Sequence, residues 1–467
     1  MGAGASAIGL NAAVRESSPR DLSESLREVS PAQRARLTAA LTRSKLEAAQ
    51  EIRDVSAELE VPMRKHPSDL DFSTFGSRPC KIEQVENRGI TVGQLRDMQA
   101  FFLAHAEGDQ GVLKGWWDRS PHRKTLDIHA HTLSLYQLVD WVVSPATSRY
   151  QCSFVELIAK GPQPTNWLIS HWWGESVIDF IACVANHAKV RGLDITTAYW
   201  VCAYANNQHE LGADLGSDPM QSSFCRALTL ASGVLLILDS EATPFSRMWC
   251  CFEEYITVMG VRSWAAPLLL DIATTEKEQT LLLIDGLTAK EAELEALRQK
   301  PGYRYGLSGW KVKSEREAAF PANILRRGLE VNVAEAKASQ DIDKRRILNT
   351  MAQRLPEELD DEPIPDHQSY TDVNRRLAGI FAMAGFRAAP HKNVDISDTG
   401  HLPLRKALRN DRKMKDLTLH LSGLLEFSNN DLKHLASNLP EGLTSVHLNF
   451  GNCWSITSVD ELGKGLA

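Results

Sequence analysis

Three short, almost continuous apolar runs in the middle of the chain restrict its fold more than any other feature. They span residues 167–170, 198–205 and 234–238, and segments with apolar residues at helical spacing separate them. Strands that are apolar on both faces belong to buried parallel sheets with helices on both sides. The sequence therefore predicts an α/β domain with an open parallel sheet over residues 166–300.

Polar residues gather directly after each apolar run. Ser170–Glu175 follows the first run, Asn206–His209 the second and Asp239–Arg247 the third. The carboxyl ends of parallel strands meet at one edge of the sheet, and open α/β sheets bind their ligands outside that edge. We therefore expect these three segments to form one ligand site.

Two segments at this edge carry a family resemblance. Residues 168–175 read LISHWWGE and resemble the first strand and loop of TIR domains, often written FLSFRGED. Residues 246–253 read SRMWCCFE and resemble the family's S-R-W-C-x-x-E motif, with one extra residue before the tryptophan. Residues 211–223 are similar to its second-strand loop and the following helix. The resemblance implies a flavodoxin-like fold for 166–300, and self-association through that domain.

The resemblance also implies a chemistry. In the NAD-cleaving branch of the family, the glutamate of the last motif acts in breaking the nicotinamide–ribose bond, and Glu253 is the matching residue. NAD is then the substrate, and no separate cofactor is expected. A partly desolvated carboxylate could stabilise the cationic ribose as nicotinamide leaves. Alternatively, Glu253 is a solvated helix residue beside Glu254.

Aromatic and polar residues around that edge are candidates for binding the substrate. A tryptophan at a strand exit can stack on a nicotinamide or adenine ring, or it can simply plug the edge of the sheet. Asparagine can bind ribose or amide groups, or it can form a turn. Trp249 lies four residues before Glu253 and would share its helix face. The residues expected to bind are Ser170, Trp172, Trp173, Gly174, Asn207, His209 and Trp249.

Other site types find little support. The chain has eight cysteines but no CxxC pair, so we expect neither a zinc site nor a disulfide framework. Cys250 and Cys251 are expected in the core, with a minor alternative role for one as a nucleophile. His129 and His131 form an HxH pair without a matching His/Asp series, so no metal site is predicted. The net charge of −7 argues against a nucleic-acid partner.

The N-terminus fits a lipidation pattern. Residues 1–6 read MGAGAS, which matches M-G-x-x-x-[ST] and makes Gly2 a candidate for myristoylation. The alternative is an ordinary small-residue start. One myristoyl chain binds membranes weakly, with K on the order of 10⁴ per molar. No apolar run approaches the roughly 18 residues of a membrane span, so we expect a cytoplasmic protein with weak peripheral membrane contact.

The rest of the chain divides into four further segments. We expect a flexible tail and helix over 1–64, a mixed helical extension over 65–165, and an insertion, a helix and an acidic linker over 301–370.

The last segment, 371–467, contains two L-x-x-L-x-L patterns 29 residues apart, with a helix expected between them at 430–439. The pattern residues are Met414, Leu417 and Leu419, then Leu443, Val446 and Leu448. This spacing is similar to leucine-rich repeats, which bind protein partners; an ordinary βα pair, or the start of a longer array, would also fit.

Three functions are consistent with these patterns. The first is an intracellular signalling enzyme that cleaves NAD. The second is a non-catalytic adaptor that acts through self-association and repeat-mediated protein binding. The third is a nucleotide sensor without turnover. The glutamate at the motif position favours the first.

Overall fold

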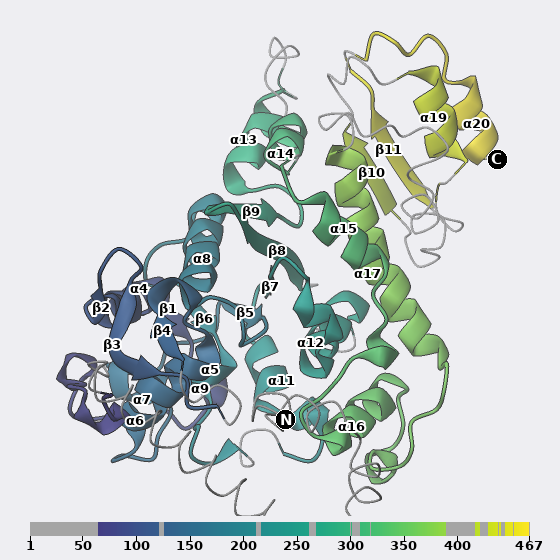
Figure 1. Cartoon of the computed structure of the whole chain (residues 1–467). Coiled ribbons are helices and arrows are strands. Elements are labelled where there is room, and N and C mark those ends of the chain that lie inside the picture. Colours follow the sequence, from purple (N-terminus) through teal and green to yellow (C-terminus); the bar gives the residue numbers. More distant parts are fainter. Residues whose placement is uncertain are drawn as a thin grey trace, which may run out of the picture. The chain divides into compact units, whose positions relative to one another are not determined.

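The computed structural model (Figure 1) describes most of the chain beyond residue 63. The described residues are 64–120, 126–211, 216–260, 268–298, 300, 309–317, 319–388, 416–420, 428–437, 439, 444–451 and 453–466. The chain divides into two units, 1–64 and 65–467. The expected lipidation site at Gly2 and the expected N-terminal helix lie outside the described residues.

A six-stranded sheet with the order β1-β6-β5-β7-β8-β9 forms the centre of the second unit. Its strands are β1 (Ile90–Thr91), β5 (Trp167–Ser170), β6 (Ala198–Trp200), β7 (Gly233–Leu238), β8 (Leu269–Glu276) and β9 (Gln279–Leu283). The four central strands are parallel, and β1 and β9 are antiparallel at the two edges. The prediction of a mostly parallel α/β sheet is confirmed. The strand order reverses between β5 and β7, which marks a topological switch point.

Alternating residues of the central strands pack against helices on opposite faces, which explains the continuous apolar runs. Ile169 and Leu235 belong to a hydrophobic cluster with α8 (Val177–Arg191). Their neighbours Leu168 and Leu236 belong to a second cluster, with α11 (Ser223–Leu228) and α12 (Met248–Met259). Figure 1 shows α8 and α12 on opposite sides of the strands. Burial of both faces therefore requires apolar residues at consecutive positions.

The segment before β5 extends the α8 side of this core. It contains a three-stranded antiparallel sheet as well as helices, and most of its buried residues share one cluster with α8, whereas Val85 belongs to the cluster with α12. Trp116 and Trp141 stack in its interior, with ring centroids 5.0 Å apart. The elements are η1 (Pro67–Asp69), η2 (Ser73–Phe75), η3 (Val85–Asn87), α4 (Val92–Leu103), β2 (Ala106–Glu107), β3 (Val112–Trp117), β4 (Asp127–His129), η4 (Ala130–Thr132), α5 (Leu135–Leu138), the π-helical turn η5 (Val139–Val143), α6 (Ser144–Thr147) and α7 (Phe154–Ile158).

The segment after the sheet is mostly helical and covers α12. Phe320, Ile347 and Phe381 join the cluster that contains α12. The segment expected as an acidic linker is instead held in place, because the Asn349 side chain donates to three of its carbonyl groups. The stretch expected as an insertion at the start of 301–370 includes a helix over Gly309–Glu317. The helices of this segment are α13 (Ala289–Arg298), α14 (Gly309–Glu317), α15 (Ala322–Leu329), η8 (Val333–Glu335), α16 (Asp341–Met351), η9 (Pro356–Glu358) and α17 (Gln368–Ala388). Three short helices not yet mentioned lie between the strands of the sheet: α9 (Cys202–Ala205), η6 (Pro219–Gln221) and η7 (Thr243–Ser246).

The last described elements form a parallel strand pair. β10 (Asp416–His420) pairs with β11 (Ser445–Asn449), and α19 (Asn429–Ala436) lies between them in the chain, with α20 (Asp460–Leu466) following. Leu417 lies opposite Val446, so the two strands are in register at the 29-residue spacing of the sequence pattern. Met414 and Leu443 lie outside the described residues. Among the described helices, none combines the length and apolar character needed to cross a membrane.

Candidate functional site

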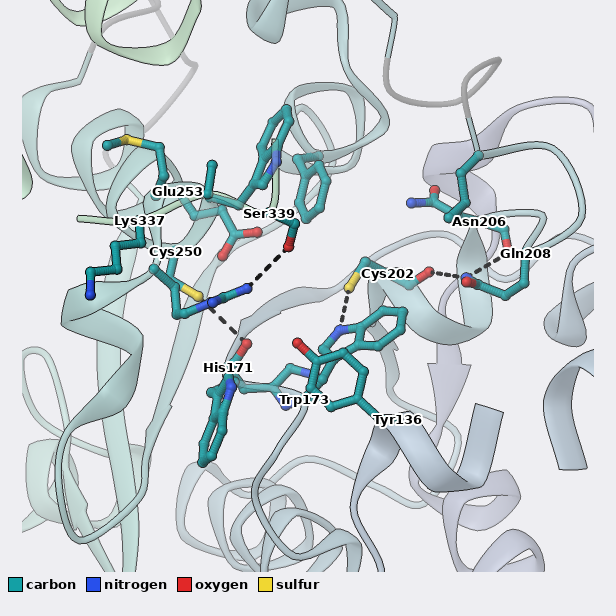
Figure 2. Close-up of a pocket in the computed structure, with 17 residues that line it drawn as sticks. Tyr136, His171, Trp173, Cys202, Asn206, Gln208, Cys250, Glu253, Lys337 and Ser339 are labelled. Carbon is teal, nitrogen blue, oxygen red and sulfur yellow. Dashed lines mark hydrogen bonds between the residues drawn. The ribbon is translucent and has the colours of Figure 1, made fainter. Parts of the chain in front are cut away.

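A cavity of about 230 Å³ lies where β5 and β6 end, beside the first turn of α12. Figure 2 shows Glu253, Cys250, Lys337 and Ser339 on one side of it and Cys202, Asn206 and Gln208 on the other. The lining residues are Tyr136, His171, Trp172, Trp173, Cys202, Asn206, Gln208, Leu211, Phe224, Arg247, Met248, Trp249, Cys250, Glu253, Lys337, Ala338 and Ser339. The carboxyl edge of the sheet therefore carries a cavity, as open α/β sheets do.

The helix α12 brings the SRMWCCFE motif to this cavity. Arg247 is its N-cap residue, and Trp249, Cys250 and Glu253 lie in its first two turns. Trp249 stacks on Phe224 with ring centroids 5.2 Å apart, and its indole nitrogen donates to Asp343 Oδ2 at 3.3 Å. The Cys250 thiol donates to the His171 carbonyl at 3.5 Å. The Trp249 contacts hold α12 against Phe224 of α11 and against Asp343, and the Cys250 contact holds it against the end of β5.

The Glu253 carboxyl is buried and forms no ion pair with any residue that the structure describes. Its side chain is 3% exposed, and Oε2 has no hydrogen-bond partner among the described residues. Burial raises the pKa of Glu253 to about 8, although the nearby Ser170 hydroxyl opposes this shift. At neutral pH the group therefore holds its proton in most molecules. A carboxyl with a strongly perturbed pKa in a cavity is a candidate for a functional group.

Two further side chains of the cavity bury polar atoms without partners among the described residues. These atoms are His171 Nε2 and Asn206 Oδ1, and both residues are at most 6% exposed. Leaving a buried polar atom unpaired costs about 1–3 kcal/mol. Together with Glu253 Oε2, three such atoms line a single cavity. This concentration indicates a site built for a polar ligand.

A second carboxyl sets the protonation of His171. His171 Nδ1 lies 2.9 Å from Glu175 Oε1, and both side chains are buried. Burial lowers the pKa of His171 to about 3 and raises the pKa of Glu175 well above its usual value. These directions favour a neutral imidazole that accepts the Glu175 proton in a hydrogen bond at Nδ1. His171 Nε2 then carries a hydrogen and offers a donor to the cavity.

Aromatic side chains form the wall opposite Glu253. Trp173 packs against Tyr136 with centroids 5.5 Å apart, and its indole nitrogen donates to Cys202 Sγ at 3.1 Å. Trp172 also lines the cavity. Gly174 does not line it, but any Cβ at position 174 would overlap the Trp172 ring. The glycine therefore allows Trp172 to occupy its place.

The structure does not bring Asn207 and His209 to this cavity. The Asn207 side chain donates to the Gln151 carbonyl at 2.9 Å and accepts from the His209 amide. His209 Nε2 lies 2.8 Å from Thr147 Oγ1. Asn206 and Gln208 line the cavity instead, because neighbouring side chains in this turn point in different directions. Ser170 lies beneath the cavity, where it affects the pKa values of Glu253 and Cys250.

Several lining residues come from segments that the sequence did not connect with the site. Tyr136 belongs to the segment before β5, and Lys337 and Ser339 precede α16. Lys337 reaches the cavity because residues 247 and 337 form an isolated parallel bridge. A contact between positions 90 residues apart leaves no periodic signal in the sequence.

The site is therefore a polar and aromatic cavity at the carboxyl edge of a mostly parallel α/β sheet. Within the described ranges, no group of three or more His, Cys, Asp or Glu residues is arranged to hold a metal ion. No family model, curated protein or solved structure matches the chain. The function must therefore be argued from the site itself.

Proposed function

We propose that this chain is a TIR-like signalling protein that binds NAD in the cavity and cleaves the nicotinamide–ribose bond. The observation that carries the proposal is that a single cavity contains three buried polar atoms, on Glu253, His171 and Asn206, which have no hydrogen-bond partner in the described part of the chain. Aromatic rings form the opposite wall of the cavity, and a flat aromatic ligand stacks well on such rings. The motif resemblance, with Glu253 at the catalytic position, supports the choice of NAD.

The chemistry needs an anionic carboxylate, and substrate binding favours one. The nicotinamide ring of NAD is cationic, and a nearby positive charge lowers the pKa of a carboxyl. Glu253 would then lose its proton and stabilise the developing positive charge on the ribose. The bonding electrons leave with nicotinamide, and water adds to the ribose carbon and releases a proton. The products are nicotinamide and ADP-ribose.

The test is nicotinamide release by the full chain at high protein concentration, with the Glu253→Gln variant beside it. We expect release from the wild type and a loss of at least about 100-fold in the variant, because the group stabilises transition-state charge. Glu357→Gln is a matched control, because Glu357 is exposed and distant from Glu253 in the sequence. Equal release by wild type and Glu253→Gln would contradict the assignment of Glu253.

A nucleotide sensor without turnover is the second candidate. It is favoured by the burial of Glu253, whose pKa of about 8 leaves it neutral before any ligand binds. NAD binding without nicotinamide release, with self-association present, would select this function. In either case, the β10–β11 pair is proposed to bind a protein partner, and the TIR-like domain to self-associate. Myristoylation at Gly2 and a cytoplasmic location stay predictions.

A further inference from the structure

Two cationic residues lie at the rim of the cavity. Arg247 and Lys337 both line it, and the backbone holds them side by side. The Lys337 amide donates to the Ser246 carbonyl at 2.8 Å, and the Met248 amide donates to the Lys337 carbonyl at 2.9 Å. The segment before α16 is thus attached to the start of α12. The two residues are therefore neighbours because of the fold.

These two charges are not neutralised within the described residues. Neither Arg247 nor Lys337 forms an ion pair with a carboxylate of the described residues, although Arg247 donates a long hydrogen bond of 3.5 Å to Ser339 Oγ. Two carboxyl groups face the same region. Asp343 accepts the Trp249 indole hydrogen, and Glu253 is buried deeper. Ser339 adds an exposed hydroxyl to the rim.

The first turn of α12 adds partial positive charge at the same place. The helix has 12 residues, and no side chain caps its N-terminal amide groups, although the Met248 amide already donates to the Lys337 carbonyl. Met248, Trp249 and Cys250, which form this turn, all line the cavity. The N-terminus of a helix attracts anions through its free amide groups and its dipole. The unpartnered Nε2 of the buried His171 independently indicates that a ligand belongs in this cavity.

The size of the cavity limits how much of a dinucleotide it can enclose. Its volume of about 230 Å³ is below the ≈ 300–1,000 Å³ that usually encloses a drug-sized ligand. It suits one ring and one sugar, next to Glu253 and the tryptophans. The remainder of a dinucleotide would then pass over the rim, where Arg247 and Lys337 lie.

We propose that Arg247, Lys337 and the first turn of α12 bind the diphosphate of a dinucleotide whose ring end occupies the cavity. This proposal rests on the proposed function, because it assigns the substrate class of the same site. It makes the site selective for ligands with a diphosphate over nucleosides without phosphate. It also gives the segment before α16 a role in ligand binding.

Calorimetric titration of the full chain with inorganic pyrophosphate tests the proposal. The variants are Arg247→Gln and Lys337→Met, with Lys290→Met as the control, because Lys290 is an exposed lysine on α13. We expect each rim variant to bind pyrophosphate about tenfold more weakly, as loss of a charged hydrogen bond predicts. The control should bind like the wild type. Equal affinity in all four proteins, or no binding by the wild type, would overturn the proposal.

Two further measurements separate this proposal from the enzymatic one. Nicotinamide riboside lacks the diphosphate, so its affinity should be the same in the wild type and in both rim variants. An equal loss for nicotinamide riboside would mean that the substitutions damage the whole cavity, which would also overturn the proposal. Pyrophosphate binding that survives in Glu253→Gln, without nicotinamide release by the wild type, would support the diphosphate site and reject the NAD-cleaving function alone.

Discussion

The carboxyl group at position 253 combines two properties that oppose each other. Its position on α12 at the end of β5 suits chemistry on a ligand, while its burial makes the charged form unfavourable. The same burial affects the neighbouring thiols, since it raises the pKa of Cys202 to about 12 and that of Cys250 well above its usual value. Neither thiol is then ionised at neutral pH, which disfavours a cysteine nucleophile. Glu253 is therefore the group whose ionisation a ligand could control.

This burial predicts how the stability of the fold depends on pH. The folded chain holds the Glu253 proton more tightly than the unfolded chain does, because the pKa rises from 4.5 to about 8. Raising the pH through this window therefore favours the unfolded state, and the Glu253→Gln substitution removes that effect. We expect the variant and the wild type to be similar in stability at pH 4, and the variant to be more stable at pH 8.5.

Urea denaturation at both pH values measures the difference. Glu357→Gln serves as the control, because Glu357 is exposed and its substitution should leave the pH dependence unchanged. If Glu253→Gln gains no stability relative to the wild type at pH 8.5, the carboxyl ionises freely and the raised pKa is incorrect.

At the scale of helices and strands, local patterns predicted more than contacts between distant segments. The apolar runs predicted β5 and β7 because their side chains are buried on both faces, whereas only the start of the run at 198–205 forms β6 and its end forms the helix α9. The motif around Trp249 and Glu253 predicted one side of the cavity, since these residues share a helix. The Lys337 contact was not predictable, because it depends on how a later segment packs on α12. Asn207 and His209 show that a polar tetrad does not reveal which of its side chains face the site.

A close contact between two helices gives a prediction at this scale. Gly328 on α15 lies against Phe381 on α17, and a Cβ at position 328 would overlap the phenyl ring. Alanine favours helices over glycine by about 1 kcal/mol, but overpacking in a core costs about 1–3 kcal/mol. We expect Gly328→Ala to lower the free energy of unfolding by about 1–2 kcal/mol, measured by urea denaturation.

Gly463 supplies the contrasting case. It lies on α20, and nothing occupies the space that its Cβ would fill. Gly463→Ala should therefore leave stability unchanged or raise it slightly, because only the helix preference acts. A stabilising Gly328→Ala substitution would show that α15 and α17 do not pack closely.

On the scale of the whole molecule, the two large hydrophobic clusters show which segments share a core and should therefore unfold together. The cluster that contains α12 includes residues from Val85 to Ala384. Neither cluster includes a residue beyond Ala384. Buried residues of the last segment, such as Leu432 and Leu435, belong to neither. The described chain up to and including α17 thus contributes to the sheet's core.

Two truncations test this division. A chain that ends at residue 388 keeps every residue of both clusters, so we expect its thermal unfolding midpoint to stay within about 4 °C of the full chain. A chain that ends at residue 318 loses Phe320, Ile347 and Phe381 among others. Each fully buried apolar side chain of that size contributes about 1.5–3 kcal/mol, and a whole domain is stable by only about 5–15 kcal/mol. We therefore expect the shorter chain not to fold. Two outcomes would show that the clusters do not mark the folding unit. One is a cooperative transition at the original midpoint in the 318-residue chain, and the other is the loss of that transition in the 388-residue chain.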